Sequence, residues 1–596
     1  MTDRWNAAGL PGGVFVSVLL LAAVLGCAGD PASEANGAAP DQTPPDQTPA
    51  AEAPLVDVTA DSGLHFQHRN GQVGQLYMAE FMGSGGAVLD VDGDGDLDLY
   101  LVQSGTLDGE TDAGLTDQVF RNVSDSGGLR FEPVDAGLEP RSSASYGQGV
   151  TAGDVDNDGR IDLYVTALGH NRLLRNRGDG TFDDLTAAAG VDDRRWSLSA
   201  AFADLDGDGW LDLVVGNYID FTVANHRVCR SENGAVDYCG PSAYPPQSNR
   251  VFRNLGGDGG GVRFADKTAD WGFTAEPGAT LGVVAADLLG DARLELYIAN
   301  DQDFNRLWSP SGPGDSLTFV DQAMLAGVAV NGEGQKEASM GVLAADFNGD
   351  GSEDLLIAHL RAETHTLYLQ GAPGGGSFFD ASLESGVGAP SRPFTGFGLA
   401  HLDLDRDGDL DVYSAHGAVR IQEELARRGD PLPLRQPDQL YRNDNGAFRD
   451  VSDDFDGGEP QVGRGVVAAD FDDDGDRDLV VINNAGPAQL LEHRGAGAWI
   501  GVRAVDPALG GRDAIGARVD IEAAGAVFRR RVDTGGGYAS GHDPRVAVGL
   551  AGLDVVAVDV SIVWPGGRVE KWSNLDVGRY HLLRKGGGDA ADSPAP

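Results

Sequence analysis

Aspartate residues recur in short loops at alternate positions, a spacing that suits the binding of a cation. The first loop starts at Asp90 and reads DVDGDGDLD, and five further copies follow the pattern D-x-[DN]-x-D-G-x-x-D. A tight turn brings the side-chain oxygens of positions 1, 3 and 5 together, and the glycine at position 6 permits that turn. Position 7 offers its backbone carbonyl, and position 9 closes the shell. Hard oxygen ligands in this number favour Ca²⁺ over zinc or copper.

The predicted calcium ligands are positions 1, 3, 5, 7 and 9 of the six intact loops. They are Asp90, Asp92, Asp94, Asp96 and Asp98; Asp154, Asp156, Asp158, Arg160 and Asp162; Asp204, Asp206, Asp208, Trp210 and Asp212; Asp346, Asn348, Asp350, Ser352 and Asp354; Asp403, Asp405, Asp407, Asp409 and Asp411; and Asp470, Asp472, Asp474, Asp476 and Asp478. A seventh copy, DLLGDARLE at Asp287, has Leu289 at position 3 and Ala292 at position 6, so we expect weak calcium binding there or none.

The alternative for one copy alone is an Asx-rich hairpin turn that binds no metal. Six copies with one spacing favour calcium, because crowded carboxylates repel one another unless a cation lies among them. The loops are not EF-hands, since the twelfth position of the first loop is Leu101, where an EF-hand has Glu. Apolar strand-like segments flank them, such as GGAVLD and DLYLVQ around the first loop.

The loops recur within a larger unit of four strands. After the strand that follows each loop comes a third strand-like segment, such as QVFRN (118–122) in the first unit. In the first six units a fourth segment follows, such as RFEPV in the first unit. Seven such units predict an all-β fold, a seven-bladed β-propeller with calcium-binding loops at residues 54–497. The seventh unit lacks a fourth strand, and LVDVT (55–59) has the signature of one. We therefore expect this N-terminal strand to close the ring beside QLLEH (489–493).

Residues 498–585 predict a small β-sandwich domain packed against the propeller. Val556, Val558, Val560, Ile562 and Trp564 alternate with smaller or polar residues, and a Pro-Gly-Gly turn follows them. Residues 586–596 (GGGDAADSPAP) are expected to form a disordered tail.

These motifs resemble two known repeat and domain types. The loops resemble the FG-GAP/VCBS repeats of integrin-α-type propellers. The C-terminal segments WIGVRAV (499–505), RDAIGARVDI (512–521), DTGGGYASGHDPRVAVGL (533–550) and VSIVWPGGRVEKW (560–572) resemble the ASPIC/UnbV domain. In this combination the chain is similar to the CRTAC1-like family of secreted acidic proteins. The resemblance implies an exported, calcium-binding protein and leaves its biochemical activity open.

The N-terminus predicts export. The apolar run VFVSVLLLAAVL ends just before Gly26 and Cys27, which indicates a signal peptide (1–27) with a lipobox and acylation of Cys27. This makes the protein an exported lipoprotein of the cell envelope, which touches the membrane only through its lipid anchor; an ordinary secretory signal is the alternative. Residues 28–53, rich in Ala, Pro, Asp and Thr, predict a disordered linker. The formal net charge of -48 excludes a nucleic-acid binder that relies on a basic face.

The other two cysteines, Cys229 and Cys239, lie in one polar insertion. In an exported chain we expect them to form a disulfide. A zinc site would need further ligands, and only His226 is close in sequence.

Three long insertions (104–117, 217–248 and 414–438) follow the second strand of their blades, so they project from the rim opposite the calcium loops. We call this the insertion rim. It predicts a concave site for a glycan or protein ligand, with stacking faces beside polar groups. The candidate ligand-binding residues are Tyr218, Phe221, Tyr238, His416 and Arg420. The alternative is that the insertions cover the propeller mouth or pack on the sandwich domain.

The sequence supplies no catalytic residue: it contains neither G-x-S-x-G nor H-E-x-x-H. We expect a calcium-stabilised binding or adhesion module at the cell surface or in the periplasm. The alternatives are a hydrolase or lyase that acts on polysaccharide at the insertion rim, and a structural subunit of an envelope complex.

Overall fold

The computed structural model describes residues 54–591, except 108–114, 126, 142–143, 258–260, 274–276, 373 and 456. The predicted signal peptide, Cys27 and the linker therefore lie outside the described residues. None of the helices in the described part of the chain has the length and hydropathy of a membrane span.

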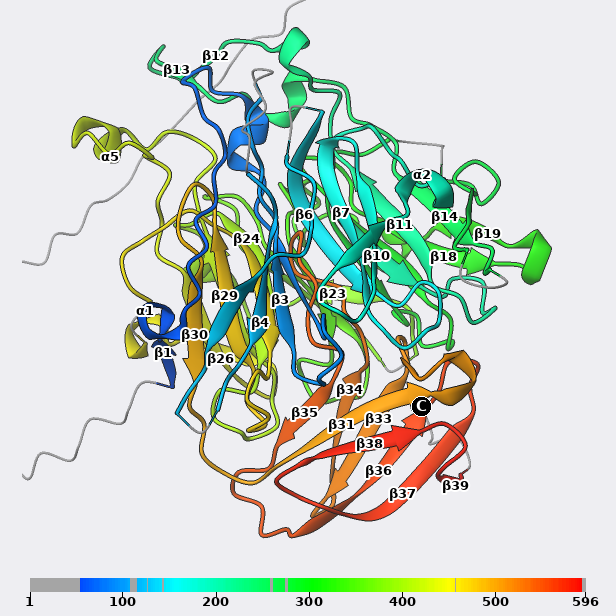
Figure 1. The fold of residues 1–596 in the computed structure, drawn as a ribbon. Helices are drawn as coiled ribbons and strands as arrows, with labels where there is room; N and C mark the ends of the chain where they lie inside the picture. Colours follow the sequence, from blue (N-terminus) through cyan, green and yellow to red (C-terminus); the bar gives the residue numbers. More distant parts are fainter. Residues whose placement is uncertain are drawn as a thin grey trace, which may run out of the picture. The chain divides into compact units, whose positions relative to one another are not determined.

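Seven antiparallel four-stranded sheets form the blades (Figure 1). The first four are β2 (Gly86–Leu89), β3 (Asp98–Leu101), β4 (Gln118–Asn122) and β5 (Phe131–Val134); β6 (Ser145–Gly153), β7 (Asp162–Gly169), β8 (Arg172–Asn176) and β9 (Phe182–Asp184); β10 (Ser197–Ala203), β11 (Asp212–Asn217), β14 (Arg250–Asn254) and β15 (Phe264–Asp266); and β16 (Thr280–Ala286), β17 (Glu295–Asn300), β18 (Arg306–Ser311) and β19 (Thr318–Asp321). The next two are β20 (Val342–Ala345), β21 (Asp354–Ile357), β22 (Thr366–Gln370) and β23 (Phe378–Asp380); and β24 (Gly396–Leu402), β25 (Asp411–His416), β26 (Gln439–Asp444) and β27 (Ala447–Asp450).

The seventh blade closes the ring with the N-terminal strand, as the sequence predicted. It consists of β28 (Gly463–Ala469), β29 (Asp478–Asn483), β30 (Gln489–His493) and β1 (Leu55–Asp57), and Leu55 pairs with His493. The innermost strands contact one another in the order β2, β6, β10, β16, β20, β24 and β28, and β28 contacts β2. The structure is therefore a closed seven-bladed propeller.

Helices are short and lie between the strands. They are α1 (Thr59–Ser62), η1 (Met78–Phe81), α2 (Thr186–Ala189), η2 (Val223–Asn225), η3 (Pro241–Ala243), η4 (Gly314–Ser316), α3 (Ala323–Ala326), α4 (Gly388–Ser391), α5 (Glu423–Arg427), η5 (Ser452–Asp454) and η6 (Pro507–Leu509). The blade-six insertion contains α5, and Gly429 follows this helix with φ +81°.

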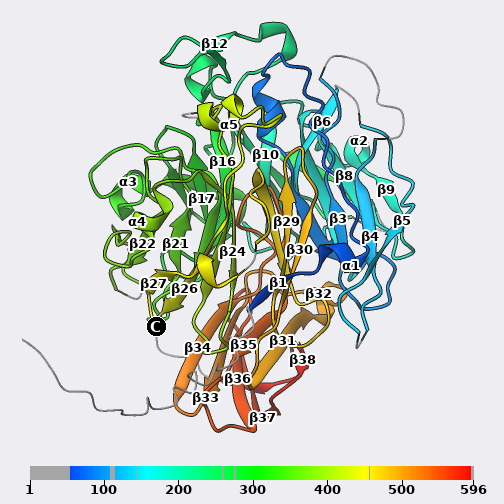
Figure 2. The ribbon, with the colours of Figure 1, turned by 90° about the vertical axis from the view of Figure 1, so that its left-hand side faces the viewer.

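The C-terminal part forms two packed sheets, drawn in orange and red in Figures 1 and 2. One contains β31 (Trp499–Asp506), β32 (Arg512–Asp513), β35 (Val546–Gly549) and β38 (Tyr580–Arg584). The other contains β33 (Arg518–Ala523), β34 (Ala526–Arg531), β36 (Ala557–Val563), β37 (Val569–Asp576) and β39 (Asp589–Ala590). A further two-stranded sheet, β12 (Cys229–Arg230) and β13 (Val236–Asp237), lies in the blade-three insertion.

The predicted start of the disordered tail, at residue 586, is wrong. Asp589 pairs with Lys571 and Ala590 with Glu570, so β39 extends a sandwich sheet. Glu570 is fully buried, and its carboxylate accepts hydrogen bonds from Gly586 N. Residues 586–590 therefore belong to the sandwich domain.

Residues 534–543, which we call the axial segment, leave the sandwich between β34 and β35 and enter the axis of the propeller. Gly541 N donates to Gly86 O (2.9 Å), and Ala539 O accepts from Val150 N (3.0 Å). Gly537 exchanges two backbone hydrogen bonds with Val342 (2.8 and 3.0 Å). The segment thus pairs with the innermost strands of blades 1, 2 and 5.

The small residues of the innermost strands make room for this segment. A Cβ atom on Gly149 would lie 2.6 Å from the Cβ of Ala539, and one on Gly85 would lie 1.9 Å from Ala539 O. A segment of the C-terminal domain therefore occupies the axis of the propeller.

Neighbouring blades are joined by a repeated side-chain hydrogen bond, which we call the blade clamp. The last residue of a third strand, or its equivalent, donates to a backbone carbonyl in the aspartate loop of the preceding blade. The pairs are Asn122–Phe471 (2.7 Å), Asn176–Asp90 (2.8 Å), Asn254–Val155 (2.9 Å), Gln370–Leu288 (2.7 Å), Asn443–Phe347 (2.8 Å) and His493–Leu404 (2.9 Å). Six of the seven blade interfaces carry it within the described residues, including the one between blades 7 and 1.

Candidate metal centres

The aspartate loops connect the first and second strands of each blade, and all adopt the same turn. Position 6 has a positive φ in every intact copy, for example +100° at Gly95 and +93° at Gly475. Glycine adopts this conformation without steric cost. The turn folds the loop back on itself, so carboxylates that are separated in sequence come together.

Within the described residues, six groups of at least three Asp, Glu, His or Cys side chains lie close enough to hold a metal ion. In each group one ligand atom per residue lies within 4.8 Å of the others. Five of the groups are Asp90, Asp92 and Asp94; Asp154, Asp156 and Asp162; Asp204, Asp206 and Asp212; Asp287, Asp291 and Glu295; and Asp403, Asp405 and Asp411. Three of these five groups join positions 1, 3 and 9, whereas the Asp90 group joins positions 1, 3 and 5 and the Asp287 group joins positions 1, 5 and 9.

Positions 1 and 9 are fixed by backbone N–H groups. In the second loop, Asp154 accepts from Gly159 N (2.8 Å), and Asp162 accepts from Val155 N (3.1 Å) and Asn176 N (2.9 Å). The same pattern recurs at Asp98, Asp212, Asp354, Asp411 and Asp478. The residue whose N–H binds position 9 is also the donor of the blade clamp, so the clamp ties each acidic loop to the next blade.

In two loops the carboxylate at position 5 forms an ion pair with an arginine side chain. Asp158 forms an ion pair with Arg160, and Asp208 pairs with Arg253 at 2.9 Å. The third-strand arginines also lie beside position 3, as Arg253 does at 2.5 Å from Asp206. Neither Asp158 nor Asp208 belongs to the convergent groups named above.

The acidic loops are electrostatically strained. Burial, with a smaller contribution from neighbouring carboxylates, raises the pKa of Asp154 to about 7 and that of Asp411 to about 8. The pKa of Asp470 rises to about 7, mainly through burial, although Arg545 and Tyr580 oppose the shift. Ionised carboxylates at this density need positive charge nearby.

Several carboxylate oxygens in the loops have no hydrogen-bond partner although they are buried. They are Oδ1 of Asp156, Oδ1 of Asp403 and Oδ1 of Asp405. All three residues stand at position 1 or 3, where a cation would bind. Buried oxygens without partners are costly, and a hard divalent cation would satisfy them. The residues present therefore fit a metal ion.

The degenerate seventh loop keeps more of the site than the sequence suggested. Ala292 adopts φ +64°, so the loss of glycine does not prevent the turn. Asp287, Asp291 and Glu295 converge despite Leu289 at position 3. The turn therefore forms without glycine at position 6, and the loop differs from the intact copies by Leu289 at position 3, Ala292 at position 6 and Glu295 at position 9. Weak calcium binding, or none, stays a prediction for this loop.

The sandwich domain lies directly on the rim that carries the aspartate loops. Gly549 N donates to Asp403 Oδ2 (2.8 Å), and Arg530 Nη2 donates to Gly408 O (2.6 Å). Arg512 Nη1 donates to Asn157 Oδ1 (2.9 Å) in the blade-two loop. The expected packing of the sandwich against the propeller is thus made through the acidic loops themselves.

Comparison with known proteins agrees with the repeated loops. The model of the FG-GAP-like repeat matches residues 90–165, 154–215, 287–357, 346–414 and 403–481, together more than half of the chain. The chain belongs to the FG-GAP-like repeat family. The model described as ASPIC and UnbV matches residues 509–590.

Curated relatives extend the match across both parts of this FG-GAP-like repeat protein. The chain is homologous to cartilage acidic protein 1: it is 28% identical to the Mus musculus protein over 529 residues, which cover 81% of this chain and 71% of the relative. It is 27% identical to the Homo sapiens protein over 526 residues, 81% of this chain and 69% of the relative.

Solved structures are more distant. A lectin of Agrocybe aegerita, described as recognising non-reducing terminal N-acetylglucosamine, aligns over 62% of this chain and 79% of its own, with a TM-score of 0.36 and 16% identity. The exotype rhamnogalacturonan lyase YesX aligns over 70% of this chain and 90% of its own, with a TM-score of 0.28 and 13% identity.

The insertion rim of this FG-GAP-like repeat protein differs from our expectation. Tyr218, Phe221, Tyr238 and His416 are 1%, 2%, 4% and 0% exposed, so they offer no stacking face to a ligand. Of the five candidate residues, only Arg420 is exposed. Apolar side chains in an insertion bury themselves wherever a neighbouring surface permits it, and here that surface is the mouth of the propeller.

The three aromatic residues belong to a hydrophobic cluster that also contains Phe81, Trp196 and residues of the axial segment. Trp196 meets Tyr218 edge-on with ring centroids 5.0 Å apart. Tyr538, in the middle of the axial segment (534–543), donates through its hydroxyl to Met82 O (2.9 Å). The alternative that the insertions cover the propeller mouth therefore describes these side chains correctly.

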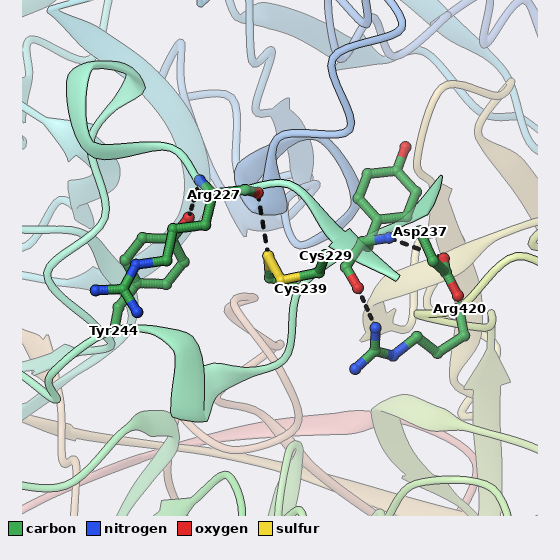
Figure 3. Close-up of a disulfide and its surroundings, with 7 residues drawn as sticks. Arg227, Cys229, Asp237, Cys239, Tyr244 and Arg420 are labelled. Atoms are coloured by element: carbon green, nitrogen blue, oxygen red, sulfur yellow. Dashed lines mark hydrogen bonds between the residues drawn. A yellow bond between two sulfur atoms is a disulfide. The ribbon is translucent and has the colours of Figure 1, made fainter. Parts of the chain in front are cut away.

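The structure contains the expected Cys229–Cys239 disulfide (Figure 3). Cys239 Sγ lies 3.2 Å from Arg227 O, and the Arg420 side chain donates to Tyr238 O. The disulfide closes a loop within the blade-three insertion, and the Arg420 hydrogen bond joins this loop to the blade-six insertion.

His416 lies in a buried polar network and has no catalytic geometry. Its Nδ1 donates to Pro437 O (2.9 Å), its Nε2 lies 2.9 Å from Ser414 Oγ, and burial lowers its pKa to about 4.

Ser339, His359 and Glu337 combine the residue types of a catalytic triad. However, Ser339 Oγ and Glu337 Oε2 both approach the same ring nitrogen, His359 Nε2, at 3.0 and 3.6 Å. A histidine that relays a proton needs one partner on each nitrogen. Ser339 is also fully buried. This group supports no catalytic assignment.

Proposed function

We propose that this FG-GAP-like repeat protein is an exported binding or adhesion module whose propeller is stabilised by Ca²⁺. The ions would bind at positions 1, 3, 5, 7 and 9 of the six intact loops. The observation that carries the proposal is the set of buried carboxylate oxygens without partners at Asp156, Asp403 and Asp405. Ca²⁺ takes six to eight oxygen ligands in flexible geometry, which suits a ring of carboxylates and a backbone carbonyl.

In this proposal the calcium ions hold the structure and do no chemistry. They neutralise carboxylates whose pKa is raised by burial, and they lie where the loops support the sandwich. The ligand of the module is a glycan or a protein. The burial of the aromatic residues at the insertion rim argues against that rim as a stacking surface.

Elemental analysis of calcium-dialysed and metal-free protein tests the calcium sites. We expect about six ions per chain, with the Asp287 loop weaker than the others. A stoichiometry of two or fewer would contradict the proposal. Replacing Asp403 by Asn should remove about one ion, whereas Asp220→Asn, outside the loops, should remove none.

A glycan array with and without chelator tests the binding function. We expect ligand binding that chelator weakens. A chain that binds calcium but shows polysaccharide cleavage would favour the hydrolase or lyase alternative. The proposed anchor at Cys27 is tested separately, because a Cys27→Ser variant expressed with its N-terminal segment should lose incorporated lipid.

A further inference from the structure

A cleft of about 950 Å³ separates the sandwich from part of the acidic rim. At blades 6 and 7 the two parts touch directly, since Gly549 binds Asp403 and Tyr580 binds Asp470. At blades 3, 4 and 5 the cleft lies between them, and loop residues such as Asp206 and Arg293 line it. Its volume is in the range of pockets that enclose small ligands.

The two walls of the cleft carry opposite charges. The propeller wall contributes five acidic residues and one cation, and the sandwich wall contributes five cations and one acidic residue. They are Asp204, Asp206, Asp208, Asp287, Glu353 and Arg293 on the propeller, and Arg512, Arg518, Arg529, Arg531, Lys585 and Asp506 on the sandwich. The chain has a net charge of -48, so five cationic side chains on one wall are a local exception. This wall is the feature from which we infer a ligand.

Some of these cations retain donors for a ligand. Among the described residues, Arg518 donates a side-chain hydrogen bond to Asp520, through Nη2 at 3.1 Å, and its side chain is 32% exposed. Lys585 Nζ donates to Asp506 at 2.8 Å, and its side chain is 27% exposed. Each bond uses one of several N–H groups, because a guanidinium has five and an ammonium three.

We propose that this cleft binds an acidic saccharide, with a carboxylate of the sugar paired to Arg518 and Lys585. A simple anion would fill little of a cleft of about 950 Å³. Sugar hydroxyls both donate and accept, so they can pair with the cations of the sandwich wall and with Glu353, which stands outside the proposed calcium-ligand positions. Leu294, Leu317 and Ile515 also line the cleft and offer apolar contact to the C–H faces of a sugar ring. This inference rests on the proposed binding function and names its ligand class and site.

Isothermal titration of the calcium-loaded full chain tests the inference. The probes are a tetrasaccharide of galacturonic acid, a neutral galactose tetrasaccharide and hexaglutamate. We expect the acidic saccharide to bind at least about tenfold more tightly than either of the others. Arg518→Ala should weaken its binding by about 10- to 100-fold, the effect of losing a charge-assisted hydrogen bond. Arg579→Ala, an exposed arginine of the same domain outside the cleft, should leave binding unchanged.

Three outcomes overturn the inference: equal binding of the neutral tetrasaccharide, tighter binding of hexaglutamate, or unchanged binding after Arg518→Ala. Absence of binding by every probe also overturns it. The melting temperature of each variant is measured in parallel, and Lys585→Ala gives a second variant if Arg518→Ala fails to fold. Because calcium stoichiometry is measured independently, a chain that binds six ions and no acidic saccharide would reject the cleft and leave the calcium proposal standing.

Discussion

The hydroxyl of Tyr580 in the sandwich domain donates to Oδ2 of Asp470, the first residue of the blade-seven loop, across 2.8 Å. Arg545 contacts the same loop, because its Nη2 donates a hydrogen bond to Asp470 O (2.5 Å). A residue proposed as a calcium ligand is therefore also part of the domain interface. Metal binding and the packing of the sandwich share this carboxylate.

Replacing Tyr580 by Phe should lower the free energy of unfolding by about 1–2 kcal/mol, because the hydrogen bond is made to an ionisable group. The ring and its cation–π contact with Arg545, 4.6 Å from the ring centroid, are retained in the variant. Chemical denaturation of the metal-free chain measures the effect. Unchanged stability would show that this bond contributes nothing to the interface.

Chelation should lower the melting temperature of the whole chain. A ligand that binds only the folded state stabilises it by RT ln(1 + [L]/Kd), about 2.7 kcal/mol for each site at ~100-fold excess over Kd. Differential scanning calorimetry with EDTA and after calcium is restored measures the shift. A melting temperature that is indifferent to EDTA would contradict the stabilising role of calcium.

Loss of a blade clamp should destabilise the ring. Asn254 is fully buried, and its Nδ2 donates to Val155 O (2.9 Å) and Leu211 O (3.1 Å). Asn254→Ala leaves both carbonyls without this donor and should cost about 2–4 kcal/mol. Leu255→Ala is the matched control, because Leu255 is 55% exposed, and it should change stability by about 0.5 kcal/mol or less. Equal effects of the two substitutions would argue against the clamp.

Removing the Tyr538 side chain from the axial segment should destabilise the protein more than the loss of a blade clamp. Tyr538 is fully buried and meets Phe397 with ring centroids 5.0 Å apart. Tyr538→Ala should cost about 3–5 kcal/mol through lost burial and the cavity left behind. Tyr538→Phe, which loses only the hydrogen bond to Met82, should cost about 1 kcal/mol. Phe379→Ala, at a ring that is 52% exposed, is the control, and urea denaturation compares all three.

Removal of the buried carboxylate at Glu80 should stabilise the protein at alkaline pH. Glu80 is fully buried, and burial raises its pKa to about 7, while the Tyr238 hydroxyl opposes part of the shift. The folded state holds the proton more tightly than the unfolded state, so stability falls as pH rises through the folded pKa. Glu80→Gln should therefore add about 3 kcal/mol above pH 7 and almost nothing below pH 4.5.

Thermal unfolding of Glu80→Gln at pH 4 and pH 8 separates this effect from a change in packing. The exposed Glu333 provides the control substitution, Glu333→Gln, which should be neutral at both values. A gain that is equal at pH 4 and pH 8 would exclude the titration of Glu80 as its cause.

Local repetition made the propeller predictable. The six intact loops, the strands around them and the lone N-terminal strand are short-range signals, and they gave both the number of blades and the pairing of the N-terminal strand with residues 489–493. The convergence of carboxylates followed from spacing and from the glycine at position 6. These features depend on residues that are near one another in the chain.

Contacts between residues that are far apart in the chain could not be predicted from the sequence. The motif RN at the end of β4, β8 and β14 was visible, but nothing local shows that Asn122 reaches Phe471, 349 residues away. The glycine-rich run at 534–543 was noted as a motif, yet its entry into another domain is also a long-range event. The aromatic residues Tyr218 and Phe221 were placed on a surface for the same reason, since a sequence does not show which apolar side chain finds a partner.

The axial segment also determines when the propeller can be completed during synthesis. All seven blades are synthesised before residues 534–543. Until this segment is made, Gly86 O, Val150 N and Ala468 O lack the partners that it supplies in the native structure. A chain ending near residue 500 would therefore contain every blade strand but none of these axial hydrogen bonds, which form only after the last domain is made.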